Sequence, residues 1–174
     1  RTSWEKSADW YDRIIGERGS ELYQAVVIPG ALKLLDVQRG DRVLDLGAHD
    51  GLLTRALQSD QIVRNRLGHV IRADLASGYR PDIVLDEEAL PFAEASFDLV
   101  VSALSLHWVN DLPGALVQIR RALRPDGLFI GAVLGGRTLT ELRQSLLSAE
   151  EEIRGGAANR ISPYLDVIDG AGLL

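Results

Sequence analysis

Cysteine and methionine are both absent from the 174 residues of this chain. Without cysteine there can be no disulfide, no thiolate nucleophile and no zinc site built on cysteine ligands. The three histidines lie far apart and lack the spacing of metal ligands, so we expect no metal site. The chain starts at Arg1 and stops at Leu174 within a stretch typical of a helix interior, so we expect it to be truncated.

Long apolar runs and an excess of positive charge are lacking as well. No run approaches the roughly 18 residues that cross a membrane, and no signal peptide is evident. The formal net charge of −6 makes nucleic acid a poor partner. With 46% hydrophobic and 25% charged residues, the composition is that of one soluble globular domain, for which a cytoplasmic location is the default.

Strand-like and helix-like segments alternate along most of the chain, which predicts an α/β fold with a mainly parallel sheet flanked by helices. The predicted strands are 42–47, 69–74, 82–85, 97–104 and 128–134; the predicted helices are 3–15, 20–36 with a break near Pro29, 51–59, 111–123 and 138–153 with Thr138 as a cap. We interpret residues 1–174 as a single domain, divided into a helical lid (1–38), a cofactor-binding core (39–136) and a C-terminal helical part (137–174).

The link between the second and third predicted strands is unusually short. Only the seven residues "LASGYRP" separate Asp74 from Asp82. A parallel crossover usually needs a dozen residues or more. The sequence therefore predicts either an uncommon short route or a loss of residues at this point.

A parallel sheet gathers the carboxyl ends of its strands at one edge, where such sheets bind ligands. The segment "DLGAHDG", residues 45–51, lies at the end of the first strand. Gly47 and Gly51 can bring the backbone close to a ligand, and the following helix presents free N–H groups to a carboxylate or phosphate. The alternative is a plain tight turn that packs a helix onto a strand.

Acidic residues follow the second and third strands. Asp74 can accept hydrogen bonds from both hydroxyls of a ribose. Asp86 can accept from an adenine amino group, with the backbone of Glu87 nearby. The alternatives are a solvated acid at the strand end and a solvated acidic loop.

His107 and Trp108 follow the fourth strand, where a substrate would meet a cofactor. Histidine is the side chain best suited to proton transfer near neutral pH. The alternative is a histidine hydrogen-bonded beneath a loop, and we expect Trp108 in the core. Spacing leaves open whether His49 faces solvent or leans over a ligand.

Taken in order, these segments resemble the motifs of class I S-adenosylmethionine-dependent methyltransferases. The resemblance covers about residues 40–136 and includes "VLDLGAHDG", "DEEALPF" and "LRPDGLFIGAVLGG". Residues 104–146, with "RISPYLDVIDGAGLL", more closely resemble the methyltransferase-like assembly factors of respiratory complex I and their bacterial relatives. They resemble less closely the enzymes that methylate malonyl-carrier protein in biotin synthesis, while "WEKSADWYDRIIGERG" is similar to the arm of small-molecule methyltransferases.

The resemblance implies a Rossmann-like class I methyltransferase fold that binds S-adenosylmethionine and lacks the C-terminal hairpin of the family. His49 stands where many methyltransferases have glycine, so its side chain must point away from the cofactor or crowd it. The resemblance implies that Asp45, Gly47 and Gly51 shape the site for the methionine part of the cofactor, and that His49 belongs to the same cofactor-binding loop. It implies that Asp74 holds the ribose, that Asp86 contacts the adenine amino group, and that Glu87 contacts the ring through its backbone. Tyr11 would form a lid, and His107 would face the substrate.

Three functions are weighed. The first is an enzyme that methylates a small molecule or carrier-bound acid, with His107 as the candidate base. The second is an assembly factor or protein-modifying partner of a respiratory-complex subunit, a group in which some members are linked to hydroxylation of a protein arginine. The third, a nicotinamide-dependent dehydrogenase, is disfavoured because the loop lacks G-x-G-x-x-G.

Overall fold

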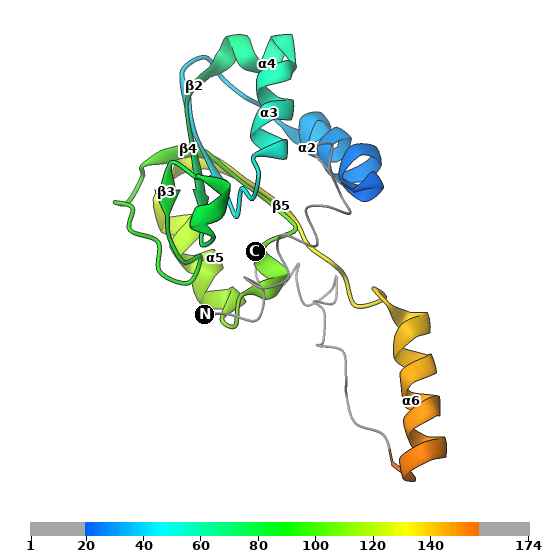
Figure 1. Cartoon of the computed structure of the whole chain (residues 1–174). Coiled ribbons are helices and arrows are strands. Elements are labelled where there is room, and N and C mark those ends of the chain that lie inside the picture. The colour runs from blue at the N-terminus through cyan, green and yellow to red at the C-terminus, as the bar shows by residue number, and fades with distance from the viewer. Residues whose placement is uncertain (1–19, 157–174) are drawn as a thin grey trace. The chain divides into compact units, whose positions relative to one another are not determined.

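The computed structural model describes residues 20–156 of the chain (Figure 1). The predicted helix at 3–15, and Tyr11 with it, lie outside the described residues. The described residues fall into two units, one that ends at Ala132 and one that begins at Val133. The first unit carries the sheet and all the predicted site residues other than Tyr11.

The first unit alternates strands and helices in the predicted way. Its strands are β1 (Asp41–Leu46), β2 (Leu67–Asp74), β3 (Ile83–Val84), β4 (Phe97–Ala103) and β5 (Leu123–Ala132). Its helices are η2 (Tyr23–Val27), α2 (Ile28–Leu34), α3 (Leu52–Ser59), α4 (Gln61–Arg66), η3 (Ser77–Tyr79), η4 (Leu106–Trp108) and α5 (Leu112–Ala122).

The five strands form one parallel sheet in the order β3-β2-β1-β4-β5. Val43 in the central strand lies between Val70 of β2 and Leu99 of β4. The strand order reverses between β1 and β4, and an open α/β sheet binds its ligands at such a switch point. The predicted parallel α/β architecture is confirmed.

Both faces of the sheet are covered. On one face Val43, Leu99 and Val101 pack with residues of α2, α3 and α4, among them Leu53 and Leu57. The alternate strand residues, such as Leu44 and Val100, are also fully buried, and α5 turns Ala115, Ile119 and Ala122 inward. Figure 1 shows α2 and α3 on one side of the sheet and α5 on the other.

Two local predictions in the first unit are corrected. The helix predicted at 20–36 does not break near Pro29, because the π-turn η2 leads into α2 and places Pro29 in its first turn, where the missing N–H is not needed. The fifth strand begins at Leu123, not at 128, because a register shift takes the predicted turn "RPDG" into β5 as a bulge with Asp126 at φ 63°.

The short link after Asp74 follows an uncommon route. β3 has two residues, and they pair with Ala73 and Asp74 at the very end of β2. The chain therefore does not have to run back along the whole length of β2 before β3 begins. The short link, which contains the 3₁₀ turn η3, is long enough for this parallel connection. Asp82 closes the link, since its carboxylate accepts the backbone N–H of Arg72 at 2.8 Å.

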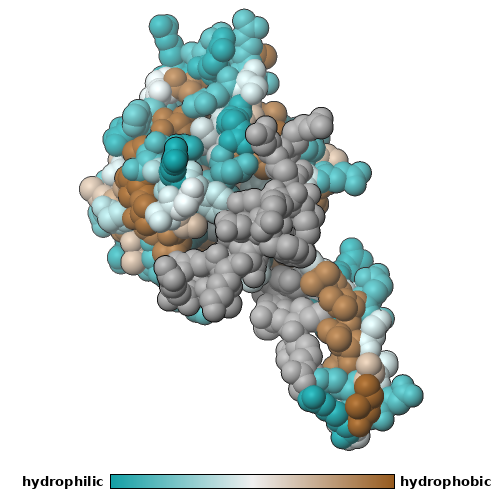
Figure 2. All heavy atoms as spheres, in the orientation of Figure 1, coloured by the Kyte–Doolittle hydropathy of each residue, from teal (hydrophilic) through white to brown (hydrophobic). Residues whose placement is uncertain are grey.

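The second unit contains α6 (Thr140–Arg154). The helix begins two residues after Thr138, which is not its cap: the N–H of Thr138 donates to the carbonyl of Gly135, and Leu139 stands before the helix with a left-handed φ of 57°. Figure 2 shows apolar side chains gathered along one side of this segment. They include Leu142 and Ile153, which are exposed.

No helix among residues 20–156 has the length and apolar character needed to cross a membrane.

Replacing Leu57 with alanine should lower the free energy of unfolding by about 2–5 kcal/mol, because Leu57 is fully buried between α3 and the sheet. Urea denaturation of the purified chain measures this change. The matched control is Ile62→Ala, which removes an aliphatic side chain that is 68% exposed and should alter stability by less than about 0.5 kcal/mol. Equal losses in the two variants would contradict the core described above.

Candidate functional site

The loops that follow β1, β2, β3 and β4 lie at the same edge of the sheet, as the parallel pairing requires. These loops carry the predicted site residues, with three exceptions: Asp45 lies within β1, Asp74 is the last residue of β2, and Tyr11 is outside the described residues. Hydrogen bonds join these loops to one another, so the site is one connected structure.

The glycine loop is fastened to the end of β2. The N–H groups of Gly47 and Ala48 both donate to the carbonyl of Ala73, at 2.9 and 3.0 Å. Gly47 has φ +68° and Gly51, which caps α3, has φ +79°. These left-handed conformations favour glycine, so both glycines are required by the backbone itself.

Gly47 is also required by a close neighbour. A Cβ atom built on Gly47 would lie 2.1 Å from both Cβ and Oγ of Ser105, which follows β4, and 3.0 Å from Oε1 of Glu87, which follows β3. The sequence predicted that this glycine lets the backbone approach a ligand. In the structure the side chain that approaches it is Ser105.

Asp45 is buried beneath the loop and turns toward α3. Its Oδ2 accepts the hydroxyl of Thr54 at 2.5 Å. Burial raises the pKa of Asp45 to about 6, and the hydrogen bonds from Thr54 partly oppose this rise. Asp45 therefore joins the end of β1 to α3, the two elements on either side of the glycine loop.

Asp74 is the carboxylate around which the site is organised. It is 5% exposed, and each of its oxygens accepts a backbone N–H: Oδ2 from His49 at 2.8 Å and Oδ1 from Ala76 at 2.7 Å. Each carboxylate oxygen has two lone pairs. Each can therefore accept one further hydrogen bond, such as one from a ribose hydroxyl.

His49 leans over Asp74. Its Nδ1 lies 3.8 Å from Oδ2 of Asp74, and its ring meets that of Tyr79 edge to face, with centroids 5.8 Å apart. The backbone of His49 is left-handed, with φ 48°, as glycine would be at this position. The imidazole therefore lies beside Asp74 and is partly exposed, and its place relative to a ligand stays a prediction.

The acidic loop after β3 contains one exposed and one buried acid, Asp86 and Glu87. Asp86 is exposed, and its Oδ1 accepts the N–H of Glu88 at 2.9 Å. Glu87 is 9% exposed, and its Oε1 accepts the hydroxyl of Ser105 at 2.5 Å. The view of this loop as solvated is therefore right for Asp86 and wrong for Glu87.

His107 lies in the turn η4, directly after β4. Burial lowers the pKa of His107 to about 4, and the charge of His49 adds to the effect. His107 is neutral near pH 7 and is a weak base there. Trp108 is 66% exposed, so the expectation that it belongs to the core is wrong: the turn directs its side chain outward.

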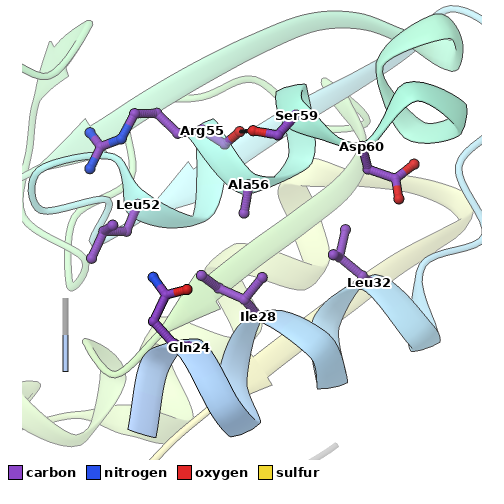
Figure 3. Close-up of a pocket in the computed structure, with 8 residues that line it drawn as sticks. All are labelled: Gln24, Ile28, Leu32, Leu52, Arg55, Ala56, Ser59 and Asp60. Atoms are coloured by element: carbon purple, nitrogen blue, oxygen red, sulfur yellow. Dashed lines mark hydrogen bonds between the residues drawn. The ribbon is translucent and has the colours of Figure 1, made fainter. Parts of the chain in front are cut away.

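A groove of about 450 Å³ lies between the η2–α2 segment and α3. In Figure 3, Ile28 and Leu32 point from one wall toward Ala56 on the other. None of the predicted site residues within 20–156 lines it. The groove therefore lies outside the constellation at the strand ends.

Several residues of the site gave no signal in the sequence analysis. Thr54 is one polar residue in an apolar helix face, a pattern that does not reveal its acid partner. The contacts of Glu88 with the segment before α5 link parts of the chain more than 20 residues apart, which periodicity cannot detect. Ser105 was noted only as part of 102–108.

Comparison with known proteins identifies the family and the fold. Residues 44–131 match the family model described as "Methyltransferase domain", and the chain belongs to that family. The fold is shared with a Haloferax volcanii methyltransferase solved in complex with the Trm112 activator, at a TM-score of 0.71 and 24% identity, over 99% of this chain and 74% of that one.

Curated relatives of two kinds are similar in sequence. The chain is 41% identical to the mitochondrial arginine-hydroxylase NDUFAF5 of Danio rerio, over 100% of this chain and 56% of that protein, and 48% identical to the one of Homo sapiens, over 75% and 39%. It is 35% identical to malonyl-[acyl-carrier protein] O-methyltransferase of Halorhodospira halophila, over 88% and 54%. The chain spans about half the length of these relatives.

Replacing Asp45 with asparagine should change how stability depends on pH. Because the folded protein holds this proton more tightly than the unfolded chain, ionisation of Asp45 costs stability as the pH rises from 3.8 toward about 6. The asparagine variant lacks this cost, so its free energy of unfolding minus that of the parent should grow by about 2 kcal/mol between about pH 4 and pH 7.

Denaturant titrations at several pH values measure this difference. Asp126→Asn, the same substitution at an exposed aspartate in the β5 bulge, is the control. A constant difference for Asp45→Asn would contradict the raised pKa.

Proposed function

We propose that this chain binds S-adenosylmethionine at the ends of β1, β2 and β3 and transfers its methyl group to an acceptor beside His107. The observation that supports this most directly is the geometry of Asp74. Its carboxylate is held by two backbone N–H groups next to the glycine loop, and both oxygens keep a lone pair for vicinal hydroxyls. The family of the chain favours the same cofactor.

The residues present fit such a cofactor. S-adenosylmethionine supplies an electrophilic methyl group on a positively charged sulfur. Asp74 would hold the ribose, Asp86 would accept from the adenine amino group, and the backbone from Gly47 to Gly51 would bind the amino-acid part. The protein then contributes position and exclusion of water more than proton transfer.

We propose a carboxylate, on a small molecule or a carrier, as the acceptor. A carboxylate attacks the methyl group without losing a proton, so no strong base is needed. His107, neutral near pH 7 with a pKa of about 4, suits an orienting role beside such a group. The likeness to malonyl-carrier-protein methyltransferases supports this acceptor class.

The second candidate is modification of an arginine side chain on a partner protein, such as a respiratory-complex subunit. The identities of 41–48% with mitochondrial arginine-hydroxylases favour it. The two candidates also imply different locations. A small-molecule methyltransferase fits the cytoplasm expected from the sequence, whereas the arginine-hydroxylase relatives are named as mitochondrial. Co-purification of the tagged chain with a respiratory subunit tests the partner. Mass spectrometry of that subunit then shows whether its arginines have gained a methyl group or an oxygen atom.

Replacing Asp74 with alanine should weaken binding of S-adenosylmethionine and of S-adenosylhomocysteine by at least about tenfold, because each charged hydrogen bond contributes about 1.5–3 kcal/mol. Isothermal titration calorimetry with each ligand measures this. Asp126→Asn serves as the control, because Asp126 is an exposed aspartate in the β5 bulge, away from the strand ends. No binding of either ligand to the parent chain would overturn the proposal.

The rate of methyl transfer should be nearly constant between about pH 7 and pH 8, because His107, with a pKa of about 4, does not change charge there and Asp45, with a pKa of about 6, is already mostly ionised. Transfer of radiolabelled methyl to malonyl-carrier protein, at saturating cofactor, measures it for the parent and for His107→Gln. A loss of about hundredfold or more in His107→Gln would show that His107 acts as a base, and would exclude the carboxylate mechanism.

A further inference from the structure

The turn η4 that carries His107 is held at both ends by two consecutive glutamates of another loop. Glu87 and Glu88 follow β3, whereas η4 follows β4. The two segments are about 20 residues apart in sequence. Their contacts decide where His107 stands relative to the loop that we assign to the adenine.

The first end of the turn is Ser105. Its hydroxyl donates to Oε1 of Glu87 at 2.5 Å, and both residues are buried, at 5% and 9% exposure. The carbonyl of Ser105 accepts the N–H of Trp108 at 2.9 Å, which closes the turn around His107. Ser105 also packs on Gly47, where any side chain would displace it. Three loops therefore meet at this end.

The other end is Asn110 and Asp111. Oε1 of Glu88 accepts the backbone N–H of Asn110, the side-chain amide of Asn110 at 3.1 Å and the backbone N–H of Asp111 at 3.3 Å. Asp111 in turn caps α5 by accepting the N–H of Gly114 at 2.9 Å. One carboxylate oxygen thus fixes the chain between His107 and α5.

The loop after β3 is itself fixed from α5. The side-chain amide of Gln118 donates to the carbonyl of Glu88 at 2.7 Å, and its oxygen accepts the N–H of Leu90 at 2.8 Å. The loop therefore cannot move alone. A displacement of 86–90 would be transmitted to both ends of η4.

We propose that Glu87 and Glu88 are positioning residues that clamp the His107 turn to the adenine-side loop, so that binding of the cofactor orders the acceptor side. The proposal rests on the proposed function for its cofactor part. It assigns to these side chains a role distinct from the backbone contact with adenine that the sequence suggested for Glu87. The clamp itself is supported by the hydrogen bonds that Ser105, Asn110 and Asp111 donate to the two glutamates.

Hydrogen–deuterium exchange tests the clamp first in the protein without added ligand. Glu88→Ala should accelerate exchange of the amides at 106–111 by at least tenfold, and Ser105→Ala should do so at 105–108. Glu88→Gln retains Oε1 as an acceptor and should restore slow exchange. Glu94→Ala, which removes an exposed glutamate of the following loop, is the matched control and should leave these amides unchanged.

The amides of β1 and β4 report on the fold in every variant and should keep their protection. Faster exchange throughout the protein in Glu88→Ala, or parent-like exchange at 106–111, would overturn the clamp. Exchange in Glu88→Gln that is as fast as in Glu88→Ala would also overturn it, because the proposal depends on the retained oxygen.

Saturating S-adenosylhomocysteine tests the coupling. In the parent, the ligand should increase the protection of the backbone amides at 47–51, 86–90 and 105–111. In Glu88→Ala it should increase protection at 47–51 and 86–90 but not at 105–111. Protection at 105–111 that persists in the variant would overturn the coupling. If the ligand does not bind to the parent at all, the proposed function and the coupling both fail, while exchange in the ligand-free protein still decides whether the clamp exists.

Discussion

The carboxylate of Asp74 is the group on which the rest of the site depends. By accepting the N–H of His49 it holds the glycine loop, and by accepting the N–H of Ala76 it starts the link to β3. A buried carboxylate is stable only if its oxygens are satisfied, and here backbone donors do this without using up its capacity. One buried carboxylate thus orders two loops. Each of its oxygens has a second lone pair that these two hydrogen bonds do not use.

The sheet explains why this arrangement can be built from so short a chain. β3 needs two residues because it lies beside the end of β2, and the strand order reverses next to β1. The loops of β1, β3 and β4 therefore converge, and Gly47, Glu87 and Ser105 come into contact. Side chains of one loop are therefore bonded to the next.

The strands, the parallel sheet and the edge that gathers Asp74, Asp86 and His107 could be predicted, because buried strands leave continuous apolar runs and parallel strands end together. The bond between Thr54 and Asp45, and the bonds of Glu88, could not. They join residues whose separation obeys no period, so composition and spacing carry no trace of them. Trp108 was wrongly expected in the core because hydrophobicity alone does not give the direction of a side chain in a 3₁₀ turn.

The two edges of the sheet are unequal, and this has a consequence for how the chain can associate. β3 offers two residues with backbone groups facing outward, a length too short to template another strand. β5 has ten residues and, among the described residues, pairs on one side with β4 and has no strand on the other. Of the two borders that the described residues form, β5 is thus the one with a backbone ladder long enough to accept an added strand.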